Sequence, residues 1–205
     1  MAYELPLFPL GSVLFPNTVL PLRVFEPRYQ RLVDDCVAGD GRFGVVLIER
    51  GSEVGGGDTR FEIGTIAHIA GIADLEEGHR LVLAVGTTRF EIDRWLPDNP
   101  YPRAVINELN DPIPPPDDLP IAATEMKLRR TLALMSEAGY DVGDTGFEVS
   151  EETGVAVDQL CALAPLSPLD AQGLLGTESP PDRLARLQNI LDEEIAVLLQ
   201  QLGSG

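Results

Sequence analysis

Residues 5–29 read LPLFPLGSVLFPNTVLPLRVFEPRY, and within this stretch the sequence pattern changes from strand to helix. Apolar and β-branched residues over Val19–Phe25 predict a strand. Pro27 suits the first position of a helix, and Gly39 suits the residue that ends one. Between them, apolar residues recur at helical spacing at Tyr29, Leu32, Val33 and Cys36. We therefore expect one helix inserted early in a region of strands.

The strand character continues to about Leu109. Further strand candidates are Phe43–Glu49, Phe61–Ile72, Arg80–Val85, Arg89–Trp95 and Ala104–Leu109. Glycine-rich breaks separate them. The break over Gly51–Asp58 lacks the lysine of a phosphate-binding loop and is expected to be a hairpin tip. Together these patterns predict a small curled sheet or pseudobarrel over residues 1–110.

The second part of the chain has a different pattern. Five of the eleven residues over Asn110–Pro120 are proline, which predicts a semi-rigid linker over residues 111–120. Beyond it the apolar period changes from two to about 3.6 residues. The expected helices are Ile121–Met135, Ser150–Leu163, Ser167–Gly176 and Ser179–Leu202. The predicted fold class is therefore α+β, with a β pseudobarrel followed by a helical bundle over residues 121–205.

Charge and hydropathy exclude several classes of partner. The 205 residues include 15 Lys+Arg and 33 Asp+Glu, which gives a formal net charge of −18. Nucleic acid and anionic membrane surfaces attract positive charge, so we expect neither as a partner. No apolar run approaches the roughly 18 residues that a membrane helix needs, and the N-terminus lacks the pattern of a signal peptide. We predict a cytoplasmic protein.

Few residues are suited to catalysis. Lys127 is the only lysine, and its surroundings match neither a Walker A loop nor a Ser–Lys dyad. His68 and His79 are the only histidines, and no Gly-x-Ser-x-Gly elbow accompanies them. Cys36 and Cys161 lie far apart in predicted helices and are expected to be buried thiols. We predict no catalytic residue, no metal site and no cofactor.

Several motifs follow one another in a characteristic order along both halves of the chain. In the first half these motifs are LPLFPLG (5–11), LPLRVFEPRY (20–29), FGVVLI (43–48), IGTIA (63–67) and GTTRF (86–90). In the helical half they are LAPL (163–166), QGLL (172–175) and DRLARL (182–187). This ordered set of motifs resembles the N-terminal domain of the Lon ATP-dependent proteases. The resemblance implies a pseudobarrel like that of PUA domains, a helical bundle and a substrate-binding role. The ATPase and peptidase modules of Lon are missing from these residues, so we expect a stand-alone substrate-binding domain.

From this resemblance and the apolar N-terminal stretch we predict a peptide-binding surface. Its candidate residues are Leu14, Phe15, Pro16, Arg23, Phe25, Glu26, Arg28 and Tyr29. The first three fall in a turn-rich segment that is expected to leave their side chains exposed, and nearby sheet edges offer backbone pairing. A structural alternative is that Glu26 and the arginines tie the helix to the sheet, while Tyr29 belongs to the core.

The leading function hypothesis is a non-catalytic module that binds unfolded or apolar polypeptide segments, as an adaptor in protein quality control. Its partners would include a separate protease or chaperone. The alternatives are a hydrolase with a site that the sequence does not reveal, and small-molecule or RNA binding by the PUA-like barrel. The sequence leaves the bound partner and the oligomeric state open.

Overall fold

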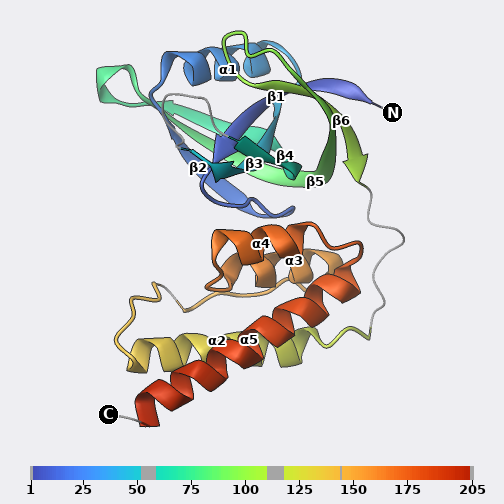
Figure 1. Cartoon of the computed structure of the whole chain (residues 1–205). Helices are drawn as coiled ribbons and strands as arrows, with labels where there is room; N and C mark the ends of the chain where they lie inside the picture. Colours follow the sequence, from blue (N-terminus) through green and yellow to red (C-terminus); the bar gives the residue numbers. More distant parts are fainter. Residues whose placement is uncertain (1, 52–58, 110–117, 144, 204–205) are drawn as a thin grey trace. The chain divides into compact units, whose positions relative to one another are not determined.

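The structure, a computed structural model, describes residues 2–51, 59–109, 118–143 and 145–203. The chain divides into two compact units, Met1–Asn110 and Asp111–Gly205. Strands make up most of the first unit and helices most of the second, so the expected α+β class is confirmed (Figure 1). Residues 52–58 of the expected hairpin tip and residues 111–117 of the expected linker lie outside the described residues.

The first unit is a curled sheet. Its described strands are β1 (Tyr3–Leu10), β2 (Val19–Val24), β3 (Arg42–Arg50), β4 (Thr59–Asp74), β5 (Arg80–Leu96) and β6 (Arg103–Leu109). They pair in the order β2-β5-β4-β3-β1-β6, and β6 pairs back onto β5, which closes most of the sheet on itself. The β1–β3 pair is parallel and the others are antiparallel. Among the described strands β2 pairs with β5 alone, so one side of β2 is a sheet edge.

Two strands differ from the sequence prediction. The segments 80–85 and 89–95 were expected as separate strands, but they form the single long strand β5. Gly86 lies inside it without ending it. β1 is not among the predicted strands, and it contains Pro6 and Pro9, residues that usually argue against a paired strand. In the structure Pro6 lies opposite Arg103 of β6 and Pro9 lies beside Val46 of β3.

Helix α1 (Pro27–Ala38) is the predicted inserted helix, and it lies over one end of the strands (Figure 1). Its buried residues are Tyr29, Leu32, Val33 and Cys36, the positions expected from helical spacing. They belong to a core cluster that includes Phe8 of β1 and Phe43 of β3. The rings of Phe8 and Tyr29 stack with 4.1 Å between their centroids. This contact attaches the start of α1 to the sheet.

The second unit contains α2 (Ile121–Glu137), α3 (Thr153–Leu163), α4 (Pro168–Leu175) and α5 (Pro180–Gly203). The apolar stripe predicted along α5 is buried at Leu184, Leu187, Leu191, Ile195 and Leu198. Inside this unit Arg183 of α5 forms an ion pair with Asp158 of α3, with 2.7 Å between nitrogen and oxygen and both side chains nearly inaccessible. No helix in the described ranges is both long and apolar enough to span a membrane.

Candidate functional site

A pocket of about 260 Å³ opens beside β2 in the first unit. It is lined by Phe8, Leu10, Pro21, Leu22, Arg23, Val24, Phe25, Glu26 and Tyr29. These residues come from the second half of β1, from β2 and from the start of α1. Its inner wall is apolar and buried, whereas Phe25 is 47% exposed. The pocket therefore combines an apolar inner wall with an exposed aromatic ring and two charged residues, Arg23 and Glu26.

Two charged residues at the start of α1 are engaged with their neighbours. The Arg28 guanidinium pairs with the Glu26 carboxylate at 3.1 Å and lies over the Tyr29 ring, 4.5 Å from its centroid. Tyr29 itself is buried in the core. The Arg28 contacts lie within the start of α1 and do not themselves join the helix to the sheet, whereas Tyr29 belongs to the core, as the structural alternative expected. These contacts also fix the wall of the pocket.

The other side of the rim is formed with help from the turn between β4 and β5. The Arg23 side chain lies 3.1 Å from Nδ1 of His79, and the rings of Phe25 and His79 are 5.9 Å apart. The amide of Gln30 donates to the Gly78 carbonyl at 2.8 Å, which connects α1 to the same turn. Sequence reasoning did not place His79 near the candidate residues, because only the long-range pairing of β2 with β5 brings them together.

Leu14, Phe15 and Pro16 do not line this pocket, and the expectation that they are exposed is wrong. Leu14 is 4% exposed and Phe15 is 2% exposed. The Thr65 hydroxyl donates to the Leu14 carbonyl at 2.6 Å, which holds the turn against the sheet. Gly86 allows this approach, since a Cβ at that position would collide with the carbonyl oxygen of Phe15. The turn is therefore part of the core.

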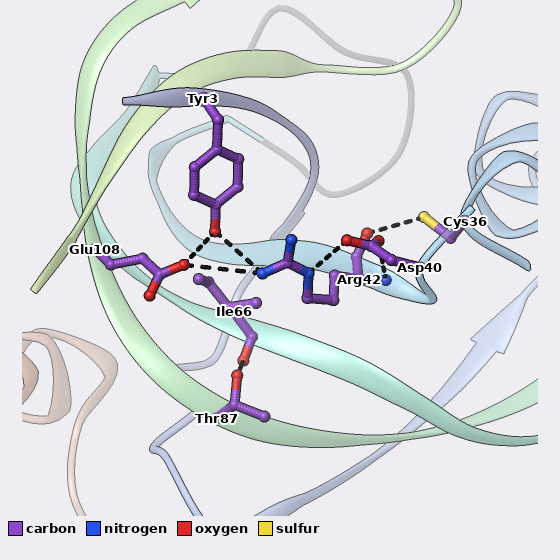
Figure 2. Close-up of polar contacts among 7 residues, drawn as sticks. All are labelled: Tyr3, Cys36, Asp40, Arg42, Ile66, Thr87 and Glu108. Carbon is purple, nitrogen blue, oxygen red and sulfur yellow. Dashed lines mark hydrogen bonds and ion pairs between the residues drawn. The ribbon is translucent and has the colours of Figure 1, made fainter. Parts of the chain in front are cut away.

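A second polar cluster lies where β1, β3 and β6 meet, and Figure 2 shows its contacts. Tyr3 donates to the Glu108 carboxylate at 2.6 Å, and Arg42 pairs with Asp40 at 2.6 Å and with Glu108 at 3.8 Å. Burial, followed by the bond to Glu108, raises the pKa of Tyr3 to about 12. Each charged group faces an opposite charge, so the cluster is suited to joining strands rather than to transferring protons.

The remaining reactive side chains have structural surroundings. Burial raises the pKa of the Cys36 thiol to about 12, and Cys161 is also buried, as expected. Lys127 pairs with Asp192 of α5 at 2.7 Å. Within the described residues, no group of three His, Cys, Asp or Glu side chains is placed to hold a metal ion.

Comparison with known proteins identifies the relatives of this fold. Residues 4–193 match the family described as the ATP-dependent protease La (LON) substrate-binding domain. Lon protease 2 of Herpetosiphon aurantiacus is 30% identical over 204 residues, covering 95% of this chain and 24% of that protein. The Lon protease of Flavobacterium johnsoniae is 27% identical with the same coverage. The chain thus spans about a quarter of the length of these relatives.

Solved structures agree with the sequence comparison. A Lon N-terminal domain protein from Xanthomonas campestris superimposes with a TM-score of 0.66 and 29% identity, covering 90% of this chain and 96% of that one. The N-terminal domain of the Lon protease of the Mycobacterium avium complex shares the fold, with a TM-score of 0.59 and 16% identity, covering 93% and 98% of the two chains. On these grounds the chain belongs to the Lon substrate-binding domain family.

Proposed function

We propose that this chain binds unfolded or apolar polypeptide segments at the pocket beside β2, without catalysing a reaction on them. The observation that carries the proposal is a pocket with an apolar inner wall located next to an unpaired strand edge. Such a site can take an apolar side chain and bond to the backbone of the same segment. The substrate-binding description of the family supports the same reading.

The size of the pocket favours a peptide side chain over a whole small molecule. Its volume of about 260 Å³ lies below the roughly 300–1,000 Å³ of typical small-molecule sites. In this proposal Arg23, Phe25, Glu26 and Tyr29 form the binding surface, and Arg28 supports it. The bound segment would then be presented to a separate protease or chaperone, which is the adaptor role.

Photocrosslinking tests the proposal directly. Benzoylphenylalanine is placed at position 25 and, as a control, at position 140, because Phe25 and Tyr140 are both about half exposed aromatics. Tyr140 lies in the second unit, outside the pocket. A labelled peptide of alternating valine and threonine should crosslink at position 25 and not at position 140. Equal labelling at the two positions, or none at either, would contradict binding at this pocket.

A further inference from the structure

Resting on the proposed function, we propose that the bound segment joins the sheet as an additional strand along the outer edge of β2. We further assign its chemistry as an extended segment with alternating apolar residues and an acidic side chain beside Arg23. The proposal combines three features of the first unit. They are the direction in which the backbone N–H and C=O groups of β2 point, the position of the pocket and the charge of Arg23.

The direction of the β2 backbone groups follows from one backbone bond. The Gly86 N–H donates to the Thr18 carbonyl at 2.9 Å, in line with the register that pairs Val19 with Val85. The backbone N–H and C=O groups of successive residues in a strand point to opposite sides. The backbone groups of the even-numbered residues of β2 therefore point toward β5. The odd-numbered residues Val19, Pro21 and Arg23 turn their backbone groups outward. Within the described chain we find no backbone bond to these outward groups.

Pro21 agrees with this assignment. It has no N–H, so a position facing β5 would remove a bond from the sheet, while an outward position removes none. An edge with a proline is also less able to pair with another copy of itself, because one donor is missing. The outward carbonyls of Val19, Pro21 and Arg23 remain available to accept N–H groups from an extended segment.

The pocket lies on the inner side of the same edge. Leu22 and Val24 are buried and line it together with Phe8, Leu10 and Tyr29. Side chains of paired strands share a face, and successive side chains point to opposite faces. Every second residue of an added strand would therefore point into the pocket. This requires apolar side chains at alternate positions, the pattern of segments that form strands when a protein is folded.

The other side chains of the added strand would lie on the exposed face of β2, beside its exposed residues. Arg23 is exposed, its guanidinium lies 3.1 Å from Nδ1 of His79, and it forms no ion pair with any described residue. A carboxylate on the added strand next to Arg23 would form a charge-assisted hydrogen bond with this guanidinium. Val19 and Pro21 lie on the same face and provide apolar contacts further along the strand.

The experiment uses backbone N-methylation of one labelled peptide, made of alternating valine and threonine with one glutamate among the threonines. In one methylated form the N–H groups of the valine residues are blocked. In the other form the N–H groups of the threonine and glutamate residues are blocked. Strand addition predicts that methylation in one form weakens binding by at least about tenfold, from the loss of two or more backbone bonds. The other form should bind like the parent peptide, because its methylated groups point away from β2.

The outcomes separate this inference from the proposed function. If the parent peptide does not bind, the proposed function fails. If it binds and both methylated forms bind equally, strand addition is overturned while the proposed function stands. A chain dimer that the peptide dissociates in sedimentation equilibrium would assign the edge to a second copy and would overturn the inference as well.

Charge reversal tests the acidic position. Arg23→Glu should weaken binding of the glutamate peptide and strengthen binding of a peptide with lysine in place of the glutamate. The control variant Arg94→Glu on β5 should change neither affinity. Arg94 is an exposed arginine that does not line the pocket. If the effects of peptide charge and residue 23 are independent of each other, Arg23 does not select an acidic side chain.

Discussion

Replacing Phe25 with alanine is expected to weaken peptide binding by about 30-fold. The residue is 47% exposed in the free protein, and with a phenylalanine area of roughly 200 Å² this leaves about 90 Å² for a ligand to cover. At about 25 cal/mol per Å², covering that area contributes about 2 kcal/mol. A loss of about 2 kcal/mol corresponds to about 30-fold in Kd, as an upper value for complete coverage.

Fluorescence anisotropy with the labelled alternating peptide measures this change. The matched control is Tyr140→Ala, which removes a 50% exposed aromatic side chain from the second unit. Both variants should lower the thermal midpoint by a similar amount, because each removes an aromatic ring that is about half buried. If Phe25→Ala changes Kd less than threefold while its circular dichroism spectrum is unchanged, the pocket rim does not bind the peptide.

Three further predictions concern the stability of the two units. Asp158→Ala should lower the free energy of unfolding by about 3–5 kcal/mol in urea titrations, because it removes the carboxylate that pairs with the buried Arg183 charge. A smaller loss than in the double variant Asp158→Leu, Arg183→Met would contradict this. Gly86→Ala should cost about 1–3 kcal/mol by displacing the buried turn before β2, whereas Gly71→Ala, whose Cβ would meet open space, should cost less. Burial and the bond to a carboxylate raise the pKa of Tyr101 from 10 to about 12. The folded protein thus holds this proton more tightly than the unfolded chain, and stability should be retained below pH 10 and fall as pH rises toward 12. Tyr101→Phe should remove part of that fall.

The sequence predicted the helices well because their signals are local. The apolar spacing from Tyr29 to Cys36 identified the buried face of α1, and the leucine stripe identified that of α5. The division of β5 into two segments was wrong, because a glycine inside a strand resembles a break when its neighbours in space are unknown. At Gly86 the glycine instead allows the Phe15 carbonyl to approach the sheet.

Sequence patterns predicted only part of the candidate site, because they do not show which distant residues are neighbours in space. Arg23, Phe25, Glu26 and Tyr29 line the pocket, and they are close neighbours along the chain. The pocket wall formed by Phe8 and Leu10 was missed, although these residues belong to the motif that carried the family resemblance. The two prolines of β1 do not fit the usual pattern of a paired strand, so the sequence did not predict how β1 pairs. The burial of Leu14 and Phe15 depends on contacts with distant strands, which local patterns do not encode.

The open edge of β2 is a consequence of how β5 and β1 each divide their residues between two neighbouring strands. β6 pairs with residues 89–96 of β5, so residues 80–85 remain for β2. β1 divides in a similar way, since residues 3–6 pair with β6 and residues 7–10 pair with β3. The sheet therefore closes at β5–β6 and leaves β2 with a single partner among the described strands. The pocket lies where β2, the second half of β1 and α1 come together. Polypeptide binding at this place would use an edge that the closure of the sheet leaves unpaired, so a change that paired β2 internally should abolish binding without unfolding the unit.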